Sequence, residues 1–288
     1  MVLQNYLRVS RSLSKLSSLG DIRELKANRH IINKLSQTVC DSDSSVDQIH
    51  SVALVALVHC NPLVRVQGGI YLPSSKLNKF EIGKYAITMD EWQRIRELAN
   101  KVGFVMAEGS GGGHRHPVTE ISWYDCLKWC NAKSTLEGLE PVYGIKGQIG
   151  CYAAGDYGAM ESDCVVFDAK ANGYRLPTDA EWEWAARGGR SAQGYTFAGS
   201  NDLDAVGWYG DNSGGVTHPI GEKAANELGL HDMSGNVWEW CWDVNGTYRR
   251  MRGGCFSGPA NFCAITHRGL DDPDYRGPDC GLRIARSL

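Results

Sequence analysis

The sequence predicts an α+β fold that is rich in loops. Its 288 residues include 34 glycines and 9 tryptophans, a combination that indicates many turns anchored by large aromatic side chains. Helical periodicity is restricted to a few short segments, which are separated by short apolar runs typical of strands. Strands and helices do not alternate as in βαβ units, and no Gly-x-Gly-x-x-Gly motif follows a strand. A nucleotide-binding fold is therefore not expected.

Composition excludes several classes of protein. The formal net charge of −3 gives no basic field that would recruit nucleic acid or an anionic membrane. The most apolar run, Val52 to Val58, is too short to span a bilayer. The N-terminus lacks the layout of a secretory signal, and the ten cysteines form no Cys-x-x-Cys pair. We expect reduced thiols, synthesis in the cytoplasm, no nucleic-acid partner and no membrane span. Display on a virion or a cell surface stays open.

Residues 1–62 differ from the rest of the chain in their pattern of apolar residues. Apolar residues recur at helical spacing from Leu13 to Leu35 and again from Val46 to Val58, with a polar break between the two segments. This pattern predicts two or three short helices. They would form either a packing appendage or a docking or oligomerisation module, and the sequence favours neither.

Residues 63–288 form the second predicted domain, beginning with short strands. Val64–Val66 and Ile70–Leu72 are expected to be strands joined by a glycine turn. A hairpin is expected from Phe80–Ile82 and Tyr85–Ile87. Three capped helices should follow: Asp90–Val102, capped by Thr88 with Glu91 in a capping box; Tyr124–Leu136, opened by Ser122 or Asp125; and Thr178–Arg187, capped by Thr178 with Glu181 at the third position.

Five motifs in this second region carry a family resemblance. They are Phe80–Thr88 (FEIGKYAIT), Pro117–Trp123 (PVTEISW), Gly173–Arg187 (GYRLPTDAEWEWAAR), Gly229–Trp240 (GLHDMSGNVWEW), and Arg252-Gly-Gly254 with Gly281-Leu-Arg283. In order and spacing they resemble the formylglycine-generating-enzyme-like family over residues 63–288. The resemblance implies a compact, loop-rich variant of the C-type lectin fold. It does not by itself imply an enzyme, because one fold hosts several unrelated functions.

The catalytic cysteines of the family are only half present. After the Arg-Gly-Gly motif, sulfatase-activating members carry two cysteines that bind copper and oxidise a substrate cysteine. The second of these positions is Cys263 here, but the first is Gly258. One thiolate cannot form a copper(I) dithiolate site, and Cys255 lies three residues early and would need a rebuilt loop to substitute. We therefore expect a non-enzymatic protein, with a copper-dependent formylglycine-generating oxidase or a related oxygen-using enzyme as the alternative.

Another branch of the family fits the chain better. The variable proteins of diversity-generating retroelements rewrite their C-terminal loops to bind new ligands, and residues 252–283 look like their variable region. In that branch diversity arises from altered adenines, typically in asparagine codons, which cannot yield Lys, Glu, Gln, Met or Trp. These five types are absent from the 37 residues after Met251, yet number 48 in the 251 residues before them. The resemblance predicts a retroelement-diversified display protein.

The variable loops would bind a protein partner on a cell or virion surface. Tyr275, Phe256 and Phe262 would supply rigid contact area, although the two phenylalanines could instead fill the core. Polar neighbours would add adaptable hydrogen bonding. The residues expected to contact a ligand are Cys255, Phe256, Ser257, Gly258, Pro259, Asn261, Phe262, His267, Gly269, Leu270, Asp271, Tyr275, Gly277, Pro278 and Asp279.

Residues outside the variable set must hold the loops in place. We expect the arginines to pair with buried carboxylates or loop carbonyls. Tryptophans are expected to pack beneath the loops, Trp242 being a further member of that group. The predicted scaffold residues are Arg252, Gly253, Gly254, Arg268, Arg276, Arg283, Trp238 and Trp240.

The one metal site that the sequence suggests is a structural calcium site. Asn236 and Glu239 resemble the family's calcium-binding turn, where backbone carbonyls would supply further oxygens. The alternative is that Glu239 bonds nearby amides. No cofactor is expected to be required. A lectin that binds glycans through a calcium site is a third interpretation of the fold.

Overall fold

The computed structural model describes residues 61–72, 75–155 and 164–288. The helices expected before residue 61 lie outside the described residues. The described elements are β1 (Leu63–Val66), β2 (Ile70–Leu72), β3 (Ser75–Lys76), β4 (Phe80–Gly83), α5 (Met89–Asn100), α6 (Trp123–Leu136), β5 (Tyr143–Ile145), β6 (Val165–Phe167), β7 (Tyr174–Arg175), α7 (Asp179–Ala186), η2 (Gly189–Ser191), α8 (Leu203–Val206), β8 (Trp238–Asn245), β9 (Tyr248–Arg252), η3 (Ala260–Cys263), β10 (Gly269–Asp271), β11 (Cys280–Gly281) and β12 (Ala285–Ser287).

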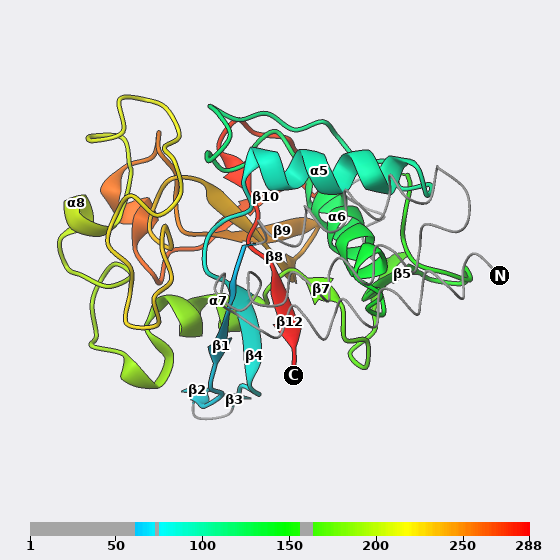
Figure 1. Ribbon diagram of the computed structural model, residues 1–288. Coiled ribbons are helices and arrows are strands. Elements are labelled where there is room, and N and C mark those ends of the chain that lie inside the picture. The colour runs from blue at the N-terminus through cyan, green and yellow to red at the C-terminus, as the bar shows by residue number, and fades with distance from the viewer. Residues whose placement is uncertain (1–60, 73–74, 156–163) are drawn as a thin grey trace, which may run out of the picture.

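Two four-stranded sheets organise the chain, and the predicted α+β class is confirmed. The first sheet has the order β1-β4-β12-β7, so the last strand of the chain pairs between two earlier ones. The second has the order β10-β9-β8-β11, with β11 parallel to β8 and the other pairs antiparallel. Figure 1 shows α5 and α6 side by side at one end, while the loops around α8 lie at the opposite end. The C-terminal loops contact both regions, because η3 packs against α8 while Trp123 at the start of α6 donates its backbone N–H to Pro273.

The expected hairpin between Phe80–Ile82 and Tyr85–Ile87 is wrong. Strand β4 pairs with β1 and with β12, and residues 85–87 form no strand. The backbone of Ile87 instead donates to Leu282 and accepts from Val118. Ile87 is therefore buried by two segments that are distant in the sequence, and it is not paired with a neighbouring strand. The first expected pair of strands also has other partners, because β1 joins β4 while β2 joins β3.

Helix caps follow the predictions more closely. The capping boxes of α6, formed by Ser122 and Asp125, and of α7, formed by Thr178 and Glu181, are both present. In α5, Thr88 accepts a hydrogen bond from the backbone of Glu91, as expected. The capping box predicted with Glu91 is wrong, because the Glu91 side chain turns away from Thr88 and is buried 3.6 Å from Lys133, where burial raises its pKa.

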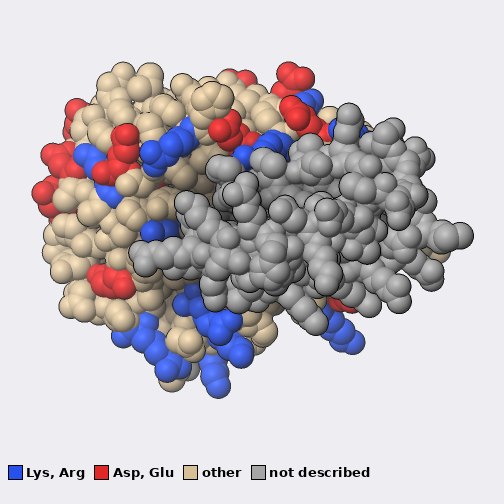
Figure 2. Space-filling view, in the orientation of Figure 1, with Lys and Arg blue, Asp and Glu red and all other residues tan. Residues whose placement is uncertain are grey.

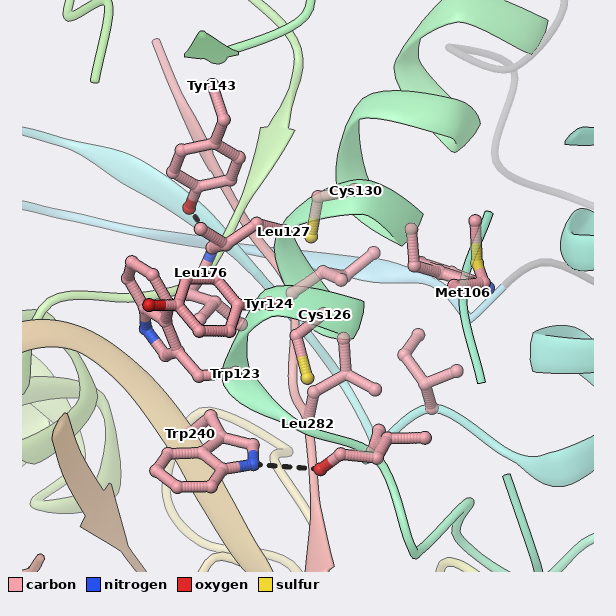
Figure 3. Packing of buried hydrophobic residues seen from close by; sticks show 14 of the residues in the cluster. Met106, Trp123, Tyr124, Cys126, Leu127, Cys130, Tyr143, Leu176, Trp240 and Leu282 are labelled. Atoms are coloured by element: carbon pink, nitrogen blue, oxygen red, sulfur yellow. Dashed lines mark hydrogen bonds between the residues drawn. The ribbon is translucent and has the colours of Figure 1, made fainter. Parts of the chain in front are cut away.

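The main core lies between α6 and the strands of both sheets. In Figure 3, Tyr124 and other residues of α6 pack beside Trp240 of β8 and Leu282. Trp92 of α5 stacks on Trp129 of α6, with ring centroids 5.8 Å apart and the planes nearly parallel. This aromatic packing fixes the two helices against each other and forms a rigid part of the core.

Seven of the eight cysteines in the described ranges are free thiols: Cys126, Cys130, Cys151, Cys241, Cys255, Cys263 and Cys280. Six are buried, and only Cys151 is exposed. Burial raises the pKa of the Cys126 and Cys130 thiols, so both remain protonated within α6. Their role as small buried apolar residues follows the prediction. No helix in the described part of the chain is long and apolar enough to cross a membrane.

Candidate functional site

The predicted variable segment, residues 252–283, contains η3, β10, β11 and the loops that join them. Seven of its candidate residues are exposed: Ser257, Pro259, Asn261, Phe262, Leu270, Tyr275 and Pro278. Five others are half-buried: Phe256, His267, Gly269, Asp271 and Asp279. Cys255, Gly258 and Gly277 are buried, a correction to the expectation that they contact a ligand, because they have almost no surface to offer.

One exposed aromatic cluster stands on a buried tryptophan. Phe262, which is 36% exposed, stacks on His267 with ring centroids 4.6 Å apart. Trp238 lies below both rings, at 6.1 Å from Phe262 and 5.8 Å from His267, and is only 7% exposed. Burial and the nearby Arg252 guanidinium lower the pKa of His267. The imidazole is therefore mainly neutral at pH 7 and contributes an aromatic face.

A tyrosine and two carboxylates continue this surface. The Tyr275 ring lies over Gly277, where an added Cβ would be 2.6 Å from the ring and 2.8 Å from Asp279 Oδ1. Asp279 accepts hydrogen bonds from the thiols of Cys255, at 3.2 Å, and Cys280, at 3.5 Å. Burial raises the pKa of Asp271, and the neighbouring carboxylates, Asp279 among them, raise it further.

The aromatic and acidic groups are linked through Gly258. An added Cβ there would be 3.4 Å from Cys255 Sγ and 3.5 Å from Phe262 Cδ2. Cys255 in turn bonds to Asp279, and Trp238, which contacts Phe262 and His267, donates its backbone N–H to the backbone oxygen of Asp279 at 2.8 Å, so the two groups are neighbours. We call this surface the acidic–aromatic patch; it consists of Phe262, His267, Asp271, Tyr275 and Asp279.

Arg252 fastens the variable segment to α7. Its guanidinium is fully buried and donates to the carboxylates of Asp179 and Glu183. It also donates to the backbone oxygens of Ile265, at 2.7 Å, and His267, at 3.1 Å. Burial alone would raise the pKa of Glu183, but hydrogen bonds from Arg252 and other donors hold it below its ordinary value. One side chain thus connects a helix, a strand end and a loop.

The other predicted scaffold arginines also find carboxylates. Arg268 bonds to Asp179 and to Glu183 at the edge of the same cluster. Arg276 reaches the capping residue Asp125 at 2.9 Å. Together these two arginines tie the middle of the predicted variable segment to the first turns of α7 and α6. The expected pairing with buried carboxylates is confirmed.

Arg283 and Glu239 form a buried ion pair at the position of the predicted calcium turn. Both carboxylate oxygens of Glu239 accept from Arg283, and Trp182 donates to the same carboxylate at 2.6 Å. The Asn236 amide bonds to both backbone groups of His218. A calcium ion would compete with these partners. Within the described ranges no group of three or more His, Cys, Asp or Glu could hold a metal ion. Calcium at Asn236 and Glu239 stays a prediction.

The tryptophans of β8 are divided between different neighbours. Trp238 lies beneath the loops, as expected. Trp240 is fully buried and donates its indole N–H to the backbone oxygen of Ile121. Trp242 stacks on Trp123 and Tyr143 instead, which corrects the expectation that it supports the loops.

A second loop, residues 207–218, supports the variable segment and was not predicted. The Ser213 hydroxyl donates to the backbone oxygen of Phe256 at 2.7 Å, and the Gly210 N–H donates to Gly258 at 2.9 Å. Trp208 and His218 stack at 3.7 Å within this loop. Because the contacts mainly use the backbone, the residue types gave no signal for them.

The buried thiols do not reproduce the family's copper pair. Gly258 occupies the first position, and Cys263 at the second is fully buried. Burial raises the pKa of Cys263 to about 12, which disfavours the thiolate that copper requires. Cys255 nevertheless reaches the neighbourhood of Gly258 without a rebuilt loop, since its sulfur lies 3.4 Å from the ideal Cβ position there.

The fold and the arginine-clamped loops define a C-type-lectin-like protein of the formylglycine-generating-enzyme type. Residues 71–288 match the family described as sulfatase-modifying factor enzyme 1-like domain, and the chain belongs to that family. The chaperone protein LppX of Paenibacillus barcinonensis is 37% identical over 261 residues, which cover 78% of this chain and 89% of LppX.

Two solved structures share the architecture. The crystal structure of CarF superposes with a TM-score of 0.71 at 27% identity, covering 80% of this chain and 100% of CarF. Variable protein 1 of Treponema denticola superposes with a TM-score of 0.63 at 30% identity, covering 78% of this chain and 92% of that protein. The similarity extends over the described domain and includes a protein named as variable.

Proposed function

We propose that this chain is a ligand-binding display protein whose variable segment, residues 252–283, is diversified by a retroelement and recognises proteins on a cell or virion surface. The observation that carries the proposal is the acidic–aromatic patch: Phe262 and Tyr275 are exposed on loops whose clamps, such as Arg252, are buried beneath them. The ligand-contacting side chains can therefore change while the frame remains. The similarity to variable protein 1 of Treponema denticola supports this role. LppX is described as a chaperone protein, which also favours a protein-binding function over an enzymatic one.

Removing both exposed aromatics should abolish binding without unfolding the protein. We expect the double variant Phe262→Ala/Tyr275→Ala to bind a peptide, selected on the full chain from a random phage-displayed library, about 100-fold more weakly. Titration of the labelled peptide measures the change. The matched control is Ile149→Ala/Val166→Ala, which truncates two exposed apolar residues near β5 and β6 and should leave affinity unchanged. Equal affinity of the double variant and the wild type would reject the patch.

The second candidate is a copper-dependent oxidase, which the proximity of Cys255 to Gly258 favours. Titration with copper(I) in the presence of a cysteine-containing peptide distinguishes the two functions. We expect neither tight one-to-one copper binding nor oxygen uptake, because the thiol of Cys263 is held protonated by burial. Tight binding that is lost in Cys263→Ser, with oxygen consumed, would reject the display function in favour of the enzyme.

A further inference from the structure

Within the described ranges, the two carboxylates of the acidic–aromatic patch, Asp271 and Asp279, have no cationic partner. The arginines of the same segment bind other acids: Arg268 pairs with Asp179 and Glu183, Arg276 with Asp125, and Arg283 with Glu239. Arg249, which lies opposite Asp271 in the β9–β10 register, donates to the backbone oxygen of Trp242. Because these arginines already have partners, the negative charge of Asp271 and Asp279 is available to a cation of a binding partner.

The internal donors to Asp279 are weak ones. Its two oxygens accept from the thiols of Cys255 and Cys280, and a thiol is a poorer donor than an ammonium or guanidinium group. Asp271 accepts from the backbone N–H of the next residue, Asp272. Both carboxylates are half-buried, so a cation that reached them would be partly shielded from water, and its attraction would be stronger than on an open surface.

Aromatic rings border the same carboxylates. The Tyr275 ring lies beside Asp279 and is 40% exposed, and Phe262, the other exposed ring of the patch, lies against Gly258. The faces of such rings attract cations, and a carboxylate next to them adds a direct ion pair. Acidic residues Asp202 and Asp204 are exposed around α8, whose first residue packs in the same small cluster as Cys263 of η3. Figure 2 shows acidic side chains along the edge where α8 lies, whereas lysines and arginines gather near β2 and β3.

We propose that the acidic–aromatic patch binds a lysine or arginine side chain of a protein partner, with the cation paired to Asp279 and Asp271 and flanked by Tyr275 and Phe262. This inference rests on the proposed binding function and specifies the chemistry of the partner. The charge complementarity and the exposed rings of the patch select a basic segment over an acidic or purely apolar one. The buried frame holds both carboxylates ready for the cation before the partner arrives.

The test uses the full chain and a random phage-displayed peptide library. Selected peptides should be enriched in lysine and arginine relative to the unselected library. One selected peptide is then synthesised with its arginine replaced by citrulline, or its lysine by acetyl-lysine, which removes the charge and keeps the shape. We expect the neutral peptide to bind about 10-fold more weakly or worse, as measured by titration.

Two variants connect the charge to the patch. In Asp279→Asn, the charged and neutral peptides should bind with nearly equal affinity, and Asp271→Asn should reduce their difference if the first variant unfolds. Glu97→Gln, which changes an exposed carboxylate on α5, should leave the difference intact. This inference would be overturned if the selected peptides were not enriched in basic residues. It would also be overturned if the wild type bound the charged and the neutral peptide equally well. Either result would leave the binding function standing. Failure to select any peptide would contradict both.

Discussion

Replacing Arg283 with methionine should lower the free energy of unfolding by about 3–5 kcal/mol, because it leaves the buried Glu239 carboxylate without its cation. Arg283 is fully buried and donates to both oxygens of Glu239 and to the backbone oxygens of Gly83 and His231. One side chain therefore joins β4, β8 and the segment before β12. Urea unfolding followed by tryptophan fluorescence measures the loss.

The control for this prediction is an exposed ion pair. Arg65 lies 3.4 Å from Glu81, and its side chain is 63% exposed. Arg65→Met should cost less than about 1 kcal/mol, since solvent screens such pairs. If Arg283→Met were equally mild, Glu239 would have another cation in solution. The structural calcium predicted at Glu239 would then become the preferred explanation, and a chelator should destabilise the variant further.

Local signals in the sequence predicted the helices well. The capping boxes at Ser122 and at Thr178 need only residues three positions apart, so one short window contains the whole interaction. Hairpin prediction failed at Tyr85–Ile87 for the opposite reason. The backbone of Ile87 is held by Leu282 and Val118 and that of Tyr85 by the Asn61 side chain, and such distant partners leave no periodic pattern in the segment itself.

The candidate site was located by the family resemblance, with composition in support, and its exposed residues were resolved by geometry. The missing Lys, Glu, Gln, Met and Trp marked the segment after Met251, but not which of its side chains face outward. Which side chains face outward depends on turns such as the one at Gly254, where a left-handed φ of 74° brings the chain close to Cys263. Cys255 is turned inward there, whereas Ser257 faces solvent. The support from Ser213 depends on a backbone contact between distant loops and has no counterpart in the sequence pattern.

Arg252→Lys should both destabilise the protein and weaken ligand binding, although Arg252 is too deeply buried to touch a ligand. Lysine keeps the positive charge, but its single ammonium cannot reproduce the forked contacts to Asp179, Glu183 and two loop carbonyls. With about two charge-assisted hydrogen bonds lost, we expect the free energy of unfolding to fall by about 3 kcal/mol. Urea unfolding measures this loss.

The same variant tests whether the frame prepares the patch for its partner. Because Arg252 holds the carbonyls of Ile265 and His267, its loss should speed amide hydrogen exchange in residues 260–268 before the remainder of the domain opens. Affinity for the selected peptide should fall with it, since the ring of His267 would no longer be fixed beside Phe262. Arg268→Lys is the matched control: that side chain pairs with the same two carboxylates but is 35% exposed, so its effect should be smaller. Faster exchange with unchanged affinity would mean that loop order and recognition are separate, and the buried clamp would then serve stability alone.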